Sequence, residues 1–114
     1  MSASGAGRVP SLMSSRKRTV VLTSEAQDDF VDIRFSTQQQ GGETERDRYE
    51  VTLLHAIAAL ADFPEVGRRS PEHFSGCRVR PVEHHVLFYR IEDDIIVVVR
   101  ILHERADPAQ HFQP

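Results

Sequence analysis

Residues 86–102, VLFYRIEDDIIVVVRIL, decide the fold of this chain. Two apolar runs rich in β-branched residues, 86–91 and 95–102, flank the acidic turn 92–94, and this pattern predicts a β-hairpin. The second run is apolar enough to predict a central, mostly buried strand. Residues 77–82, CRVRPV, alternate apolar and polar side chains and predict a further strand. The C-terminal half is therefore expected to form a small sheet.

The N-terminal half carries the pattern of a strand followed by two helices. Residues 19–23, TVVLT, predict a short strand that ends at Ser24, where Ser24 and Gln27 match a capping box. Apolar side chains then follow helical spacing in two stretches, separated by a pair of glycines and ended by a proline, and the short glycine link predicts an antiparallel helical hairpin. The side chains expected to face the core are Ala26, Phe30, Ile33, Thr37, Tyr49, Leu53, Ala56, Ile57 and Leu60.

These elements together predict an α+β fold. An N-terminal strand and an antiparallel helical hairpin are expected to pack on a small, mostly antiparallel sheet of about four strands. Connection rules permit the first strand to pair beside the last. Residues 64–76 hold prolines and glycines and are expected to form a surface connection, and Asp107 and Pro108 predict a short terminal helical turn.

Length and composition restrict the function. The 114 residues suit one domain, expected at 19–114 after a flexible tail at 1–18; whether residues 1–12 are native stays open, because Met13 is an equally sensible start. A net charge of -3 argues against nucleic acid as the main partner and against sequence-specific DNA binding by this chain alone. No run is apolar enough to span a membrane, and a single cysteine, Cys77, fits a cytoplasmic setting.

Four segments, in this order and spacing, resemble a known family: LTSEAQDDFVDI at 22–33, LADFPEVGR at 60–68, HHVLFYRI at 84–91 and IIVVVRILHERADPAQHF at 95–112. They are similar to the ParE branch of the RelE/ParE toxin superfamily. The resemblance implies the toxin of a type II toxin-antitoxin system, neutralised by a ParD-like antitoxin in a 2:2 complex or a multiple of it. The ParE branch poisons DNA gyrase, whereas the RelE branch cleaves messenger RNA on the ribosome, and one fold serves both activities.

The charged stretch 100–108, RILHERADP, bears on that choice. A RelE-type nuclease needs a base, an acid and cations around the phosphate, and its candidates here are Arg80, Arg90, Arg100, His103 and Tyr89. The acidic balance and a tail without tyrosine or lysine after His103 favour a gyrase-binding toxin instead. The hypothesis of a gyrase-binding toxin requires no catalytic residue and no cofactor. Its target-binding candidates are Arg100, His103 and Arg105. The ribosome-dependent nuclease is the alternative, and a toxin scaffold that has lost its target is a third hypothesis.

Arg100 interrupts the most apolar strand. With strict alternation it would share a face with Ile96, Val98 and Leu102. It is then expected to emerge at the sheet edge or to pair with a carboxylate such as Glu83 or Glu92, and this structural role is weighed equally with contact to a target.

Three other features have structural interpretations. His84 and His85 are adjacent strand residues that point to opposite faces, so no metal site is expected there. Cys77 is expected to be a small packing residue. The acidic stripe on the first helix is expected to be solvated, or else to meet basic residues of an antitoxin. It consists of Asp28, Asp29 and Asp32.

Overall fold

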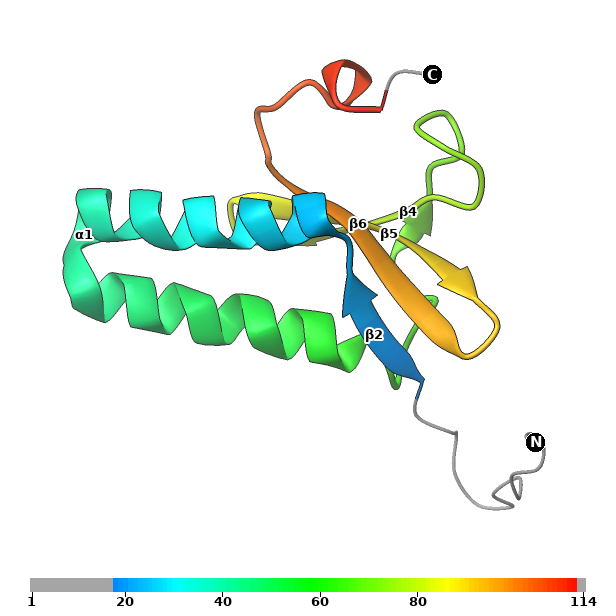
Figure 1. Cartoon of the computed structure of the whole chain (residues 1–114), viewed down its shortest axis with the longest axis horizontal. Helices are drawn as coiled ribbons and strands as arrows, with labels where there is room; N and C mark the ends of the chain where they lie inside the picture. The colour runs from blue at the N-terminus through cyan, green and yellow to red at the C-terminus, as the bar shows by residue number, and fades with distance from the viewer. Residues whose placement is uncertain (1–17, 113–114) are drawn as a thin grey trace.

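The computed structural model describes residues 18–112, in which a helical hairpin packs on one face of an open sheet (Figure 1). The expected tail at 1–18 therefore lies outside the described residues, apart from Arg18. The elements in chain order are β2 (Thr19–Leu22), α1 (Ser24–Ala59), β3 (Arg68–Arg69), β4 (Arg78–Val82), β5 (His85–Glu92), β6 (Ile95–His103) and the 3-10 turn η1 (Pro108–Gln110). The predicted α+β class and the order of its elements are confirmed.

The sheet has five strands in the order β2-β6-β5-β4-β3. The hairpin β5–β6 and the neighbouring β4 are antiparallel, whereas β2 runs parallel to β6 with Thr19 opposite Ile95 and Leu22 opposite Val98. The first strand thus lies beside the last, as the connection rules allow. The fifth strand, β3, was not predicted, because two residues inside a turn-rich connection are too few to show a period of two.

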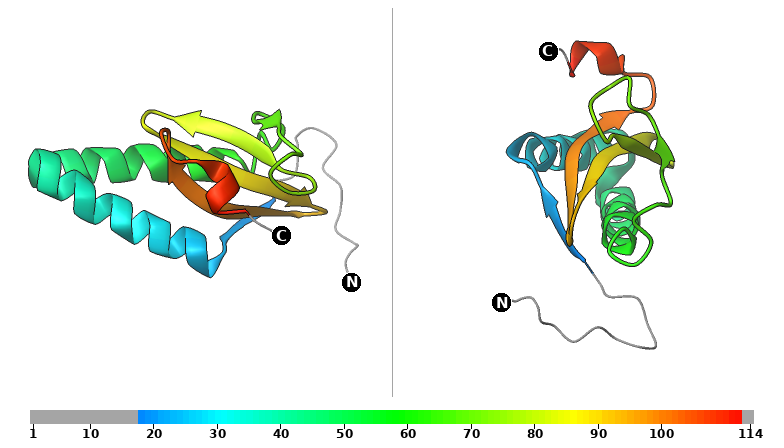
Figure 2. Two further views of the ribbon diagram at one scale, coloured as in Figure 1. Left: turned by 90° about the horizontal axis from the view of Figure 1, so that it is seen from above. Right: turned by 90° about the vertical axis from the view of Figure 1, so that its right-hand side faces the viewer.

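α1 is the predicted hairpin of two helices. Residues 24–41 and 43–59 run antiparallel, and the chain reverses at Gly42, which has φ 86° and ψ −177° (Figures 1 and 2). Only glycine adopts that backbone conformation without strain, which explains the reversal at this point. Besides apolar packing, two side-chain hydrogen bonds join the arms. They are Arg34 Nε to Glu50 Oε1 at 2.8 Å and Arg46 Nη1 to Gln38 Oε1 at 2.8 Å.

The predicted helix start is wrong by one residue. Thr23, not Ser24, is the N-cap: its hydroxyl oxygen accepts a hydrogen bond from the backbone nitrogen of Ala26 at 3.0 Å. The same hydroxyl donates to the backbone oxygen of Val99 at 2.7 Å, so it joins the helix start to β6. The side chain of Gln27, in the first turn of the helix, donates a hydrogen bond to the backbone oxygen of Leu22, which precedes the N-cap.

Apolar side chains form a cluster on each face of the sheet. The first lies between α1 and the sheet; it contains the predicted positions Ala26, Ile33, Tyr49, Leu53, Ile57 and Leu60, with Phe30 and Ala56 half-buried beside them. The second lies on the opposite face, where Cys77, Val79, Phe88 and Leu102 pack under Phe74 and Phe112. The packing role of Cys77 is confirmed, and burial raises the pKa of its thiol to about 11. No helix within residues 18–112 is long and apolar enough to cross a membrane.

A bulge at Val99 changes the register of β6. Phe88 lies opposite Arg100 while Tyr89 lies opposite Val98, so Val99 has no partner on β5. Arg100 therefore lies at a position of the Phe88 face and not on the face of Val98. The expectation that Arg100 shares a face with Ile96 and Val98 is wrong, because strict alternation takes no account of the extra residue.

Candidate functional site

The tip of the hairpin and one end of the sheet enclose a hollow of about 480 Å³. Its helix side includes Thr37, Glu45 and Tyr49, and its sheet side includes His85, His103 and Arg105. We call the group Tyr49, His84, His85, His103 and Arg105 the histidine corner. It holds two of the three target-binding candidates predicted from the sequence.

His85 and Tyr49 form the inner part of the histidine corner. The Tyr49 hydroxyl and Nδ1 of His85 share a hydrogen bond of 2.6 Å, and the hydroxyl also accepts from the backbone nitrogen of His84 at 3.1 Å. Burial, and to a smaller extent the neighbouring His103 and His84, lower the pKa of His85 to about 4. His85 is therefore a neutral imidazole at physiological pH.

His103 and Arg105 form the outer, exposed part of the histidine corner. The His103 ring stands edge-on to the ring of His85, with 5.2 Å between their centroids. Nδ1 of His103 accepts a hydrogen bond from the backbone nitrogen of Arg105 at 3.1 Å, so in the neutral ring the proton lies on Nε2. The histidine corner thus exposes imidazole hydrogen-bonding groups and a guanidinium that a binding partner can contact.

Histidines at this end do not assemble a metal centre with their neighbours. His84 pairs instead with Glu104, with 3.2 Å between Nδ1 and Oε2. Within residues 18–112, no group of three histidine, cysteine, aspartate or glutamate side chains is placed to hold a metal ion.

Arg100, the third target-binding candidate, lies in a different environment. Its Nε and Nη2 donate to the two carboxylate oxygens of Asp29 at 2.8 and 2.9 Å, and these side chains are only 20% and 12% exposed. The expected partners are wrong: Glu83 pairs with Arg48 and Glu92 with Arg90.

Asp29 is also an exception within the acidic stripe. Asp28 and Asp32 are exposed, as expected, but Asp29 accepts a third hydrogen bond, from the backbone nitrogen of Ile101 at 2.9 Å. Expecting Asp29 to be solvated was therefore wrong, because helical spacing does not reveal a carboxylate that turns toward a strand edge.

The five nuclease candidates lie on both faces of the sheet. Arg80 lies opposite Leu87 and His103 opposite His85, so both share the α1 face with Tyr89, whereas Arg90 and Arg100 share the Phe88 face. Tyr89 is fully buried; its hydroxyl donates to the backbone oxygen of Pro64 at 2.7 Å and accepts from the backbone nitrogen of Gly67 at 2.8 Å. The register thus brings together only part of the set.

Sequence reasoning missed Tyr49 and His85 as members of the histidine corner. Tyr49 was expected only in the core, and His85 only at a strand start. A hydroxyl at a core position of a helix is a weak signal for a buried polar contact, since such a hydroxyl needs a partner. The identity of that partner depends on how the hairpin sits on the sheet.

Comparisons with known proteins agree with this architecture. The family model described as "ParE toxin of type II toxin-antitoxin system, parDE" matches residues 20–108. A chain of the chromosomal ParDE toxin-antitoxin system from P. aeruginosa is 18% identical and superposes with a TM-score of 0.68, covering 78% of this chain and 98% of that one. A chain of the toxin-antitoxin complex RelBE2 from Mycobacterium tuberculosis is 21% identical, with a TM-score of 0.60 and coverage of 76% and 98%. The comparison with curated proteins finds no match.

The two similar structures show that the chain has this fold, and the family match shows the protein family. The matched residues run from β2 to the start of η1, so they include the sheet apart from Thr19, the helical hairpin and the histidine corner. The chain therefore belongs to the ParE toxin family of type II toxin-antitoxin systems, within the RelE/ParE superfamily.

Proposed function

We propose that this toxin inhibits DNA gyrase by binding it, with no catalysis of its own. The observation that carries the proposal is the division of the nuclease candidates between the two faces of the sheet. Proton transfer and charge stabilisation at one phosphate require groups within hydrogen-bond reach of each other or of one reacting atom. Tyr89 and Arg100 are moreover held in contacts with the protein itself.

The histidine corner is the surface we assign to the target. His103 and Arg105 are exposed, lie two residues apart, and are joined by a hydrogen bond, so they present a defined arrangement without needing a conformational change. Arginine is enriched where proteins bind proteins, because it combines charge, several donors and apolar contact area. Arg100 is the weaker candidate for target contact, since its guanidinium is already engaged by Asp29.

The partner that controls the toxin is expected to be a ParD-like antitoxin, in a 2:2 complex or a multiple of it, in the cytoplasm. The family match supports an antitoxin partner, since the matched family is one of type II toxin-antitoxin systems. A small domain with an open sheet edge and a helical hairpin suits a partner segment that folds as it binds.

Induced expression in a gyrase-containing bacterial host tests the proposal. We expect growth arrest with broken chromosomal DNA while protein synthesis continues at first, and relief when the neighbouring antitoxin is co-expressed. An immediate stop of protein synthesis without DNA breaks would contradict gyrase as the target. Unimpaired growth at a verified protein level would instead support a scaffold that has lost its target.

A second candidate function, ribosome-dependent cleavage of messenger RNA, is favoured by one observation. The histidine corner places the rings of His85 and His103 next to each other, beside the Tyr49 hydroxyl and Arg105. A neutral imidazole can accept a proton, and a guanidinium can stabilise a phosphate. Cleavage of a translated messenger by the purified chain with ribosomes, abolished by His103→Gln, would establish this activity; no cleavage with active ribosomes would remove it.

A further inference from the structure

The far end of the sheet from the histidine corner carries an unusual set of arginines. Each of the two short strands there contributes two of them: Arg68 and Arg69 on β3, and Arg78 and Arg80 on β4. Among residues 18–112, no carboxylate lies within ion-pair distance of any of the four. Of the seven other arginines in the described chain, five have carboxylate partners and two, Arg18 and Arg105, do not. The five are Arg34, Arg46, Arg48, Arg90 and Arg100.

Register sorts these four arginines onto two faces. Arg69 lies directly opposite Arg78, and Arg80 follows two residues along β4, so these three share the face that α1 covers elsewhere. Arg68 lies opposite Val79 and belongs to the other face. We call Arg69, Arg78 and Arg80 the arginine face.

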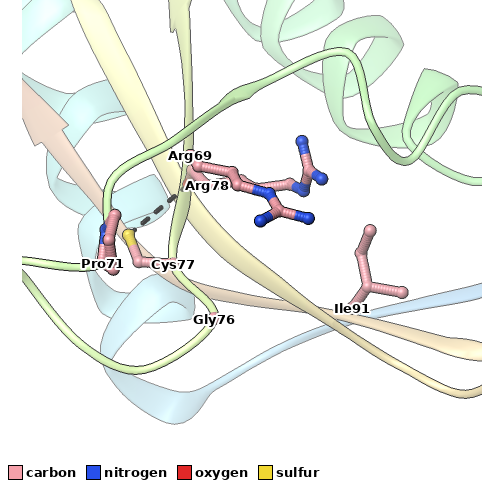
Figure 3. Close-up of a pocket in the computed structure, with 6 residues that line it drawn as sticks. All are labelled: Arg69, Pro71, Gly76, Cys77, Arg78 and Ile91. Carbon is pink, nitrogen blue, oxygen red and sulfur yellow. Dashed lines mark hydrogen bonds between the residues drawn. The ribbon is translucent and has the colours of Figure 1, made fainter.

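Two like charges directly across an antiparallel pair repel each other. The guanidinium groups of Arg69 and Arg78 nevertheless lie together over a hollow of about 380 Å³, with Ile91 on its other side (Figure 3). Arg78 is fixed there, because its Nη1 donates to the backbone oxygen of Gly67 at 2.8 Å. An anion bound between the two guanidinium groups would remove the repulsion, so the free chain is arranged to gain from binding one.

We propose that the arginine face binds an extended, acidic segment of the antitoxin. The inference rests on the proposed function, since it assigns a surface to that partner. Paired guanidinium groups match carboxylates in charge and in bidentate geometry. The outer side of β3 carries no further strand in the described chain, so an extended peptide can add main-chain hydrogen bonds there.

Nucleic acid fits this surface less well than a peptide does. The chain as a whole carries a net charge of -3, which repels a long polyanion that extends beyond the patch. A short acidic segment interacts only with charges within about a Debye length, roughly 8 Å at physiological salt.

The open edge of β4 leads from the arginine face toward the histidine corner, and this direction favours the antitoxin as the source of the segment. β3 covers only Arg78 and Val79 of β4, which leaves the edge at Arg80–Val82 open toward His84. A segment that continues in line with β3 would therefore run toward the histidine corner. One extended chain could then bind the arginine face and cover the surface assigned to the target.

The test is the affinity of the full-length toxin for the antitoxin encoded beside it, measured by titration at low and high salt. The test variant is Arg69→Gln with Arg80→Gln; Arg78 stays unchanged because it holds Gly67. We expect the dissociation constant to rise by roughly tenfold and its salt dependence to weaken. Arg69→Gln alone is compared with Arg68→Gln, because each removes one charge from the same strand, on opposite faces. Arg68→Gln should change the dissociation constant by less than about twofold, whereas Arg69→Gln should raise it by more than that.

Three results would overturn the inference. Unchanged affinity and salt dependence in the double variant, in a complex that does form, would contradict the arginine face and leave the proposed function intact. Binding of a short fluorescent DNA duplex that the double variant loses, with antitoxin affinity unchanged, would assign the surface to nucleic acid. A wild-type toxin that forms no complex with the neighbouring gene product would overturn the inference and the proposed partner together.

Discussion

Asp29 and Arg100 close the sheet edge that β2 leaves open. β2 pairs with β6 only as far as Leu22 opposite Val98, and beyond that point Asp29 on α1 takes the place of a strand. Its Oδ2 accepts from Nε of Arg100 at 2.8 Å and from the backbone nitrogen of Ile101 at 2.9 Å. One carboxylate thus satisfies a strand donor and a half-buried cation, and joins the hairpin to the sheet.

Replacing that carboxylate should destabilise the fold. In Asp29→Asn, the half-buried guanidinium of Arg100 loses its counter-ion, and the free energy of unfolding should fall by about 2 kcal/mol. Urea unfolding measures the change. Asp28→Asn is the control, since the neighbouring side chain is exposed and the substitution removes the same charge. Equal stability of the two variants would show that the ion pair contributes little.

The position of the helix cap can be tested with two neighbouring substitutions. Thr23→Ala removes an oxygen that caps Ala26 and a donor to Val99, so it should lower the free energy of unfolding by about 1–2 kcal/mol. Ser24→Ala lies one residue further on, in the first turn, and should change it by less than about 0.5 kcal/mol. The reverse order of effects would place the cap at Ser24, as the capping-box pattern indicated.

The reversal of the hairpin depends on Gly42. Its φ of 86° and ψ of −177° are almost exclusive to glycine, so Gly42→Ala should lower the free energy of unfolding by about 1–3 kcal/mol. A Cβ at this position meets no atom within 4 Å, so the loss would come from backbone strain and not from a collision. Urea unfolding measures the change, and Gln39→Ala, at an exposed helical position, should have little effect in the same experiment.

His85 should make stability fall in mild acid. Its pKa is about 4 in the folded chain against an ordinary value of 6.5, so the unfolded chain binds the proton more tightly. The contribution of His85 is therefore complete above pH 6.5 and is lost as the pH falls from about 6.5 to 4, by roughly 1–2 kcal/mol after allowance for its partial exposure.

The comparison of variants isolates this effect. His85→Gln should flatten the dependence of the free energy of unfolding on pH between 4 and 6.5, whereas His55→Gln, at an exposed position of α1, should leave it unchanged. If His85→Gln kept the wild-type dependence, other groups would be responsible for it.

Local patterns predicted the elements of this fold, but not the contacts that join them. The run at 95–102 predicted β6, and the Gly41-Gly42 pair predicted the turn of the hairpin, because apolar periodicity and glycine conformation act within a few residues. The bulge at Val99 left no trace in a continuous β-branched run. It decides which face Arg100 occupies, and so no rule of alternation could have identified its partner on α1.

The residues of the candidate site were likewise predicted only in part. His103 and Arg105 were singled out from the sequence because they belong to the charged stretch 100–108. Tyr49 and His85 were not, because the 2.6 Å contact between them joins residues 36 positions apart and exists only once the hairpin rests on the sheet. Both groups belong to one hollow, and only the tertiary structure brings them together.

Inhibition of gyrase by this toxin can be measured in a DNA cleavage assay. Purified toxin is mixed with gyrase from the same organism, supercoiled plasmid and ATP, with and without antitoxin, and linear DNA trapped by denaturation is measured. We expect linear plasmid in proportion to toxin, its loss on addition of antitoxin, and weaker accumulation with His103→Gln and Arg105→Gln combined. No linear plasmid above background from an active gyrase would contradict gyrase poisoning.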